Sequence, residues 1–291
     1  MKLPPIAQRL FRCQFVLALL LHALSSFSTP ADSVFVETVL QQYAGKAFSP
    51  GGLTAAIGRE FLGRPYVGGT LEVNAPDSEA LVVNTREVDC TTFVDQVLAL
   101  VLTALDGEES YPAFCRWLTT LRYRDGVVNG YASRLHYFTD FVADNNEVFW
   151  LVPADDGPFA AVQRVELSFM STHPDSYPAL RDKPETIALI RDVESRYKEY
   201  PVRFIPKNSP SFYALLKEGD VVALLTTTSG LDVSHLGIAV EEGGELRLLH
   251  ASSSAGKVLI DSHPLQAMVM GRKSCQGIRA IRLKDNRQRD Y

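Results

Sequence analysis

The chain has 291 residues, of which 46% are hydrophobic, 22% charged and 10% aromatic. These fractions are typical of a globular protein and exclude a disordered, collagen-like or coiled-coil chain. The formal net charge is -5, from 29 basic and 34 acidic residues. Because there is no basic excess, the sequence does not predict binding to nucleic-acid phosphates. The length suits one large domain or two small ones.

Residues 1–30 have the three-part order of a secretory signal. A head with three basic residues is followed by an apolar run over residues 15–21 and then by small residues up to Ala31. The run is shorter than the roughly 20 apolar residues that a membrane-spanning helix needs. We therefore expect a signal peptide over residues 1–30, an exported protein that is periplasmic or secreted, and no membrane span in the mature chain. The alternative is an N-terminal core helix.

The next part of the chain is predicted to be helical. Residues 34–62 contain two helical stretches with Ser49-Pro50-Gly51-Gly52 between them, and Ser49 is suited to start the second one. A turn-rich loop over residues 62–70 and a short strand over residues 80–84 follow. From Thr91 to residue 105, apolar residues recur at spacings of three and four. That spacing predicts an amphipathic helix.

Residues 108–200 show no clear period, and we interpret them as an insertion of short helices and loops that is not an independent domain. From residue 204 the pattern changes to β, with four predicted strands over residues 220–225, 234–240, 245–250 and 277–283. Helices followed by antiparallel strands predict an α+β fold, as a single domain over residues 31–291. The last residues, 284–291, are polar and expected to be frayed.

Three cysteines follow the predicted signal. An odd number in an exported protein leaves at least one free thiol or an intermolecular bridge. Cys115 and Cys275 are possible partners, although the sequence does not show that their backbones approach closely enough. Cys90 is then left over. It stands in Asp89-Cys90-Thr91-Thr92, at the start of a predicted helix.

A cysteine at a helix N-terminus is placed for nucleophilic chemistry. The positive end of the macrodipole and the unpaired N–H groups favour the thiolate of Cys90, which is the nucleophilic form. The same N–H groups can stabilise the oxyanion that forms when an amide carbonyl is attacked. A small buried hydrophobe is the alternative interpretation of a cysteine taken alone.

Two histidines are predicted to complete the site. His235 lies in the strand over residues 234–240, and His250 ends the strand over residues 245–250. If these strands pair across a Gly243-Gly244 turn, Glu242 faces Glu245. His235 and His250 then share a face as diagonal neighbours, with Cβ atoms roughly 7 Å apart. A slip of one residue would put them on opposite faces.

In this arrangement His235 takes the proton from Cys90, and His250 orients the ring of His235 and favours its charged form. That is the nucleophile, base and orienting group of covalent catalysis. Each histidine alone could instead be a satisfied core residue. A zinc site is the other alternative, but the usual closely spaced ligand pairs are missing. We predict no metal and no cofactor.

Four motifs, in this order along the chain, resemble the NlpC-type, papain-like cell-wall hydrolases: Gly63-Arg64-Pro65-Tyr66, Asp89-Cys90-Thr91, His235-Leu236-Gly237-Ile238 and His250-Ala251. Further stretches resemble the N-acetylmuramoyl-L-alanine amidase-like branch, first catalogued as a domain of unknown function; they span residues 88–94, 133–140, 170–174, 230–235 and 249–253. The resemblance covers residues 34–283. It implies a papain-like core, in which the N-terminal helices, with the helix of the catalytic cysteine, pack on a C-terminal antiparallel sheet or barrel.

The resemblance implies a cysteine amidase that cuts the amide between N-acetylmuramic acid and L-alanine in muropeptides, during cell-wall turnover or recycling. Cys90 would be the nucleophile, His235 the base and His250 the third member. Tyr66 would contact the oxyanion or the substrate, although the long gap from Tyr66 to Asp89 departs from the wider clan. Asp89 would accept the scissile amide N–H or only cap the helix.

The predicted insertion is the natural place for substrate specificity. Arg134 has the guanidinium fork that holds a carboxylate, and His136 and Tyr137 could stack on or hydrogen-bond a sugar. Surface packing or internal ion pairs are the alternatives for these residues. Three residues of the matching stretches complete the predicted substrate-binding set: Thr91, Asp232 and Ser234. The expected partners are muropeptides, without nucleic acid, and the chain is expected to be a monomer.

Two other functions stay open. One is a cysteine endopeptidase that cuts a γ-D-glutamyl bond within the stem peptide. The other is an inert wall-binding protein that kept the scaffold, which the intact Cys90, His235 and His250 disfavour.

Overall fold

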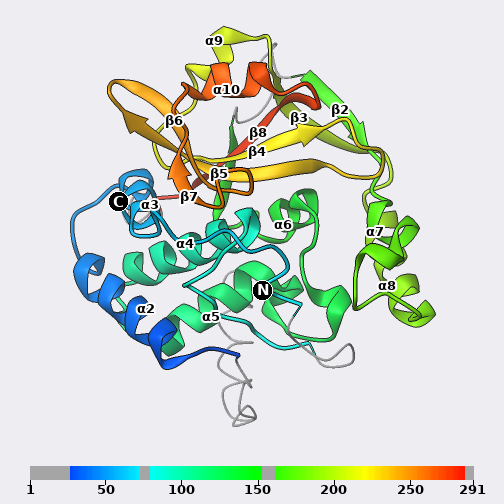
Figure 1. Cartoon of the computed structure of the whole chain (residues 1–291), viewed down its shortest axis with the longest axis horizontal. Helices are drawn as coiled ribbons and strands as arrows, with labels where there is room; N and C mark the ends of the chain where they lie inside the picture. Colours follow the sequence, from blue (N-terminus) through cyan, green and yellow to red (C-terminus); the bar gives the residue numbers. More distant parts are fainter. Residues whose placement is uncertain (1–26, 73–78, 153–160, 286–291) are drawn as a thin grey trace, which may run out of the picture.

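Four helices from the first half of the chain form one layer of the protein. The structure is a computed structural model, and it describes residues 27–72, 79–152 and 161–285. The four helices are α2 (Pro30–Tyr43), α3 (Pro50–Arg59), α4 (Cys90–Leu105) and α5 (Tyr111–Arg122). They pack on one another and on one face of a sheet (Figure 1), around a buried core that contains Phe61, Phe93 and Leu98.

The starts of α3 and α4 follow from their cap residues. Ser49 Oγ accepts the N–H of Gly52 at 3.1 Å. Asp89 Oδ1 accepts the N–H of Thr92 at 2.8 Å, and the N–H of Asp89 donates to Thr92 Oγ1 at 2.9 Å, which closes a capping box. The helices predicted in residues 34–62 and from Thr91 are confirmed. Only glycine fits at position 51 of α3, because a Cβ there would lie 2.4 Å from the backbone oxygen of Glu218.

The later part of the described chain forms an eight-stranded antiparallel sheet in the order β2-β3-β8-β4-β5-β6-β7, with β1 also paired to β8. The strands are β1 (Phe149–Val152), β2 (Ala161–Val165), β3 (Tyr200–Pro206), β4 (Val221–Thr226), β5 (Val233–Glu242), β6 (Glu245–Ser252), β7 (Lys257–Ile260) and β8 (Cys275–Leu283). The four predicted strands correspond to β4, β5, β6 and β8. Glu242 pairs with Glu245 and Ile238 with Leu249, so the predicted hairpin register is confirmed.

Successive side chains of a strand point to opposite faces of the sheet, so the strands contribute to two separate cores. Val221, Ala223 and Ile281 belong to the core shared with the helices α3 and α4. Their neighbours Val222 and Leu224 belong to a second core on the other face. Two short helices cover that face, α9 (Pro210–Tyr213) and α10 (Leu265–Gly271), above the sheet in Figure 1. The mixed α+β class predicted from the sequence is therefore confirmed.

The prediction of a strand over residues 80–84 is wrong. Val82 makes only an isolated bridge with Phe27. Leu81, Val82 and Val83 are all buried, and two of them pack in the helical core instead of alternating between core and solvent. Burial of every residue gives a continuous apolar run, which sequence alone does not distinguish from a buried strand.

Residues 108–200 are not an insertion of helices and loops alone. Helix α5 packs against α4, β1 joins β8, and β2 pairs with β3. These strands are short and find their partners far along the chain, so they leave no period of their own. The remaining elements are α6 (Phe138–Asp144), α7 (Phe169–Thr172), α8 (Pro184–Ser195), η1 (Arg124–Gly126), η2 (Tyr131–Ser133) and η3 (Pro174–Ser176).

Cys115 and Cys275 are both free, so the possible disulfide does not form. Cys115 packs at the border of the helical core, whereas Cys275 lies in the core on the other face of the sheet. Residues 1–26 of the predicted signal and residues 286–291 of the predicted frayed end lie outside the described residues. None of the helices described has the length and apolar character needed to cross a membrane.

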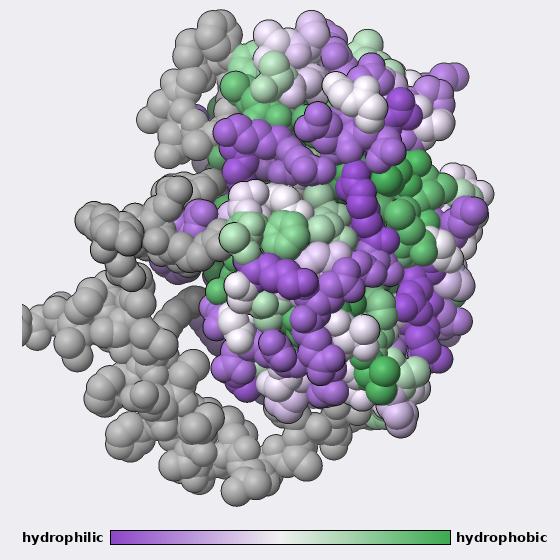
Figure 2. Space-filling model, turned by 90° about the vertical axis from the view of Figure 1, so that its left-hand side faces the viewer, coloured by the Kyte–Doolittle hydropathy of each residue, from purple (hydrophilic) through white to green (hydrophobic). Residues whose placement is uncertain are grey.

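The face of the protein that lies on the left of Figure 1 carries mostly hydrophilic side chains. In Figure 2, apolar residues on this face gather in separate patches between polar ones.

Candidate active site

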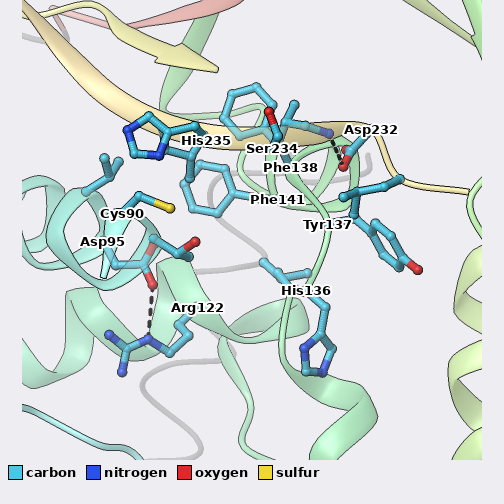
Figure 3. Close-up of a pocket in the computed structure, with 16 residues that line it drawn as sticks. Cys90, Asp95, Arg122, His136, Tyr137, Phe138, Phe141, Asp232, Ser234 and His235 are labelled. Carbon is cyan, nitrogen blue, oxygen red and sulfur yellow. Dashed lines mark hydrogen bonds and ion pairs between the residues drawn. The ribbon is translucent and has the colours of Figure 1, made fainter. Parts of the chain in front are cut away.

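A small cavity lies where the N-terminus of α4 meets the start of β5 (Figure 3). It encloses about 130 Å³. Cys90 and Thr91 from α4 line it, together with His235 and Ser234 from β5. The structure therefore brings the predicted nucleophile and the predicted base to one pocket from segments about 145 positions apart.

Cys90 is the first residue of α4 because Asp89 caps that helix. Burial raises the pKa of the Cys90 thiol to about 11, and the negative charge of Asp89 acts in the same direction. Hydrogen bonds to the sulfur from the backbone of Leu236 and from the side chain of Thr91 oppose this rise. The sequence predicted that the helix N-terminus would favour the thiolate. That prediction is wrong for the resting protein because desolvation outweighs the helix end.

His235 and His250 form a hydrogen-bonded pair. The distance between His235 Nε2 and His250 Nδ1 is 2.7 Å, and the rings are nearly perpendicular. His250 is 2% exposed. The predicted hairpin register puts both rings on one face, as expected. His250 engages Nε2 of His235, so Nδ1 is the ring nitrogen of His235 that this bond leaves free.

Both histidines are neutral at ordinary pH. The pKa of His235 is lowered to about 3, mainly by burial and in part by the neighbouring His250 and Arg272. Burial also lowers the pKa of His250 to about 4, although Asp261 raises it in part. The resting site is thus a neutral thiol beside a neutral imidazole.

This charge state predicts how Cys90 reacts with iodoacetamide. We expect slow alkylation at pH 7 and a rate that rises about tenfold per pH unit toward pH 11, because only the thiolate reacts. Peptide-level mass spectrometry separates Cys90 from Cys115 and Cys275 in the same sample. A fast rate that stays constant from pH 5 upward would instead show a resting thiolate–imidazolium pair.

Tyr66 lies beside the cysteine. Burial raises the pKa of its hydroxyl, and negative charge on Cys90 and Asp89 raises it further. Its N–H donates to Gly256 O at 2.9 Å, which fixes the loop against the β6–β7 turn. Thr91 and the exposed Ser234 line the cavity. These predicted substrate-binding residues are therefore close to the sulfur or on the pocket wall.

Arg134 is held by the protein itself. Its guanidinium contacts Glu72 at 2.7 Å and Glu79 at 2.9 Å, and it lies over the ring of Tyr131. The internal ion pair, which the sequence left as an alternative to a substrate carboxylate, is what the structure shows. Burying the charged side chains of Arg134 and Glu79 in this way requires their charges to pair with each other.

Tyr137 and His136 also have internal partners. The Tyr137 hydroxyl donates to Glu194 Oε1 at 2.7 Å and accepts the N–H of Met170. His136 Nε2 is 2.9 Å from the Tyr131 oxygen, and burial lowers the pKa of His136 to about 3. Figure 3 shows both rings directed away from Cys90. Both residues still line the cavity, and their contact with a sugar stays a prediction.

Asp232 supports the pocket wall. Its carboxylate accepts the N–H of Thr139 at 2.6 Å and the N–H of Val233 at 2.9 Å. These bonds join the start of α6 to the start of β5. Asp232 and Leu231 also line a second cavity of about 370 Å³, which adjoins the first.

Several residues at the pocket were not predicted from the sequence. Asp95, on α4, pairs with Arg122 of α5 at 3.1 Å (Figure 3), and both are buried. Burial raises the pKa of Asp95, and the charge of Arg122 opposes this rise. A charged residue among the apolar residues of the helix predicted from Thr91, Asp95, was the available signal. Phe138 and Phe141 of α6 give the pocket an apolar wall.

A zinc site at this cavity does not fit the geometry. His235 Nε2 and His250 Nδ1 bond to each other, so these nitrogens do not face a shared ion. In the part of the chain that the structure describes, no group of three or more His, Cys, Asp or Glu is placed to hold a metal.

Comparisons with known proteins identify the family of this chain. The AmiA-like family profile, described as N-acetylmuramoyl-L-alanine amidase-like, matches residues 56–278. A search of curated proteins found no match. A crystal structure of an N-acetylmuramoyl-L-alanine amidase from Bacteroides uniformis is 37% identical with a TM-score of 0.76, and the alignment covers 81% of this chain and 99% of that one.

Two further solved structures are similar. A Bacteroides fragilis protein named as a candidate xylanase is 43% identical with a TM-score of 0.73, over 78% of this chain and 99% of that one. A Legionella pneumophila protein of family DUF1460 is 20% identical with a TM-score of 0.64, over 87% of this chain and 94% of that one, and it shows the fold alone. With the family profile matched over most of its length, this chain belongs to the N-acetylmuramoyl-L-alanine amidase-like family.

Proposed function

We propose that this protein is a cysteine amidase that hydrolyses the amide between N-acetylmuramic acid and L-alanine in muropeptides. One observation carries the proposal. His235, which lines the same cavity as Cys90, is held through Nε2 by His250 at 2.7 Å. A nucleophile, a base and a group that orients the base are the parts that covalent amide hydrolysis needs. The family and its solved relative point to the same bond.

The reaction proceeds through a thioester. As the sulfur of Cys90 attacks the scissile carbonyl carbon, His235 takes the thiol proton and a C–S bond forms. Collapse of the oxyanion breaks the C–N bond, and His235 gives its proton to the leaving amine of L-alanine. Water then attacks the thioester with His235 as base, which releases the sugar carboxylic acid and restores the thiol.

The N-terminus of α4 and Tyr66 would stabilise the oxyanion. The first N–H groups of a helix have no partner within the helix, and those of Cys90 and Thr91 begin α4 beside the sulfur. Asp89 is committed to capping that helix, which favours its structural role over a grip on the substrate amide.

The substrate is larger than the catalytic cavity. Drug-sized ligands occupy about 300–1,000 Å³, whereas this cavity encloses about 130 Å³. Only the groups next to the scissile bond fit there. The adjoining cavity of about 370 Å³, reached past Leu231 and Asp232, would take a further part of the muropeptide.

A glycosidase is disfavoured by the acids of the catalytic pocket. Sugar hydrolysis uses two carboxyl groups that face the substrate. The described carboxylates that line this cavity are Asp95, which pairs with Arg122, and Asp232, which accepts two backbone N–H groups. Neither is placed to act as an acid or as a nucleophile on a sugar.

A papain-like core and export to the cell wall belong to the same proposal. A helix that begins at the nucleophile and packs on an antiparallel sheet supports the first. A substrate in the wall, together with the basic and apolar order of residues 1–30, supports the second.

The products of a defined muropeptide test the function. We expect mass spectrometry to find the free sugar acid and a peptide with a free L-alanine amine, together one water heavier than the substrate. The assay should compare anhydro and reducing sugars, with a xylan oligosaccharide as control substrate. A sugar–dipeptide product would assign the endopeptidase, and an unchanged substrate would assign the inert wall-binding protein.

A further inference from the structure

The far side of the His250 ring faces a carboxylate. His250 Nδ1 bonds to His235, while His250 Nε2 is fully buried and lacks a hydrogen-bond partner among the described residues. A charged group, Asp261 just after β7, lies close to it, with Oδ2 at 3.9 Å from Nε2. A buried polar ring atom without a partner needs an explanation, because leaving it unpaired costs free energy.

The distance of 3.9 Å limits what joins these two groups. It exceeds the length of a normal hydrogen bond. His250 Nε2 is buried, so the ring and the carboxylate act on each other through charge, and a small movement of Asp261 would close a hydrogen bond.

The surroundings of Asp261 favour its charged form. Burial raises its pKa, but the hydrogen bonds from the backbone N–H and the ring of His263 outweigh burial and lower the pKa below the usual value. The carboxylate is 19% exposed. Its position is fixed by its own N–H, which donates to Leu248 O at 2.8 Å.

The charge on Asp261 decides where the ring protons lie. A bare lone pair on His250 Nε2 would repel the carboxylate, so Nε2 carries the proton. Nδ1 of the neutral ring is then an acceptor, and the 2.7 Å bond requires His235 Nε2 to be the donor. His235 Nδ1 is left without a proton, as a general base for Cys90 must be.

We propose that Asp261 is a positioning residue that fixes the tautomers of His250 and His235, so that the base presents an unprotonated nitrogen to the nucleophile. The inference rests on the proposed function, and it extends the catalytic set from three residues to four. Asp261 never contacts the substrate in this role. It acts through two rings in series.

Nitrogen-15 NMR of histidine-labelled protein tests the tautomers without any substrate. In the native protein we expect both His235 and His250 to carry the proton on Nε2. In Asp261→Asn, the asparagine oxygen keeps the bond from His263, and its NH₂ group faces His250. We then expect both rings to change to the Nδ1 proton form. Native rings found in the Nδ1 form would overturn the proposal, even if the variant failed to fold.

Turnover gives the second measurement. We expect Asp261→Asn to lower kcat by about 10²- to 10⁴-fold, because an Asp-to-Asn change that puts a catalytic imidazole in the wrong tautomer costs up to about 10⁴-fold, with KM unchanged within about twofold. Glu245→Gln is the matched control, since it removes an exposed carboxylate from the strand of His250 and should change neither property. A variant with changed tautomers but full kcat would refute the proposal. If the native protein cleaves no muropeptide, the tautomer result still decides this inference separately from the proposed function.

Discussion

Replacing Cys90 by alanine is expected to lower muropeptide turnover at least about 10⁴-fold, because it removes the only sulfur placed in the described catalytic cavity. The helix should persist. Alanine has the highest helix propensity, and the cap formed by Asp89 and Thr92 does not use the cysteine side chain. Turnover should be measured by product mass spectrometry at saturating substrate, with the melting temperature recorded for the same sample.

The chain supplies the control for this experiment. Cys115→Ala removes a thiol at the border of the helical core, away from the cavity, and should leave kcat within about twofold of the native value. A chelator should have no effect on either protein, since the proposed mechanism uses no metal. Substantial turnover by folded Cys90→Ala protein would refute the thiol mechanism and leave the family assignment untouched.

Asp140→Asn is expected to lower the free energy of unfolding by about 3 kcal/mol. The Asp140 side chain is fully buried and holds both terminal nitrogens of Arg124 at 2.7 Å, while the Tyr197 hydroxyl donates to it at 2.6 Å. The carboxylate thus ties α6, which forms the apolar wall of the pocket, to η1 and to the end of α8. Removing one partner of a buried pair leaves the other charge uncompensated.

Urea unfolding at pH 7 measures this loss. Arg164→Gln is the comparison, since Arg164 and Glu199 form an exposed pair at 3.5 Å that is worth under about 0.5 kcal/mol. Equal losses for the two variants would show that burial does not decide the strength of the Asp140 pair. We expect Asp140→Asn also to lose more activity than its change in stability explains at 25 °C, because Phe138 and Phe141 lie on the same short helix.

The hairpin of β5 and β6 could be predicted from the sequence. Two glycines at a turn fix the register of the strands beside them, and a period of two then decides which side chains share a face. The contact between His235 and His250 followed from this register and from the alternation of side chains along the two strands. Helix α4 was accessible for a similar reason, since its apolar period and its cap residues are both local.

The internal partners of the predicted substrate-binding residues could not be predicted from the sequence. Arg134 looked like a carboxylate receptor because the sequence does not show that Glu72 and Glu79 fold against it. Tyr137 likewise finds Glu194, which lies on another helix. A long polar side chain suits a substrate or an internal partner equally well, and only the fold determines which one is within reach.

The sequence by itself determined the class of fold, the start of the cysteine helix and the pairing of the two imidazoles, since each depends on spacing within a short stretch of chain. The tertiary structure decided the charge state of the site and placed Asp261 behind His250. Burial and long-range packing set those properties. Desolvation depends on every element around a group, and no local pattern records it.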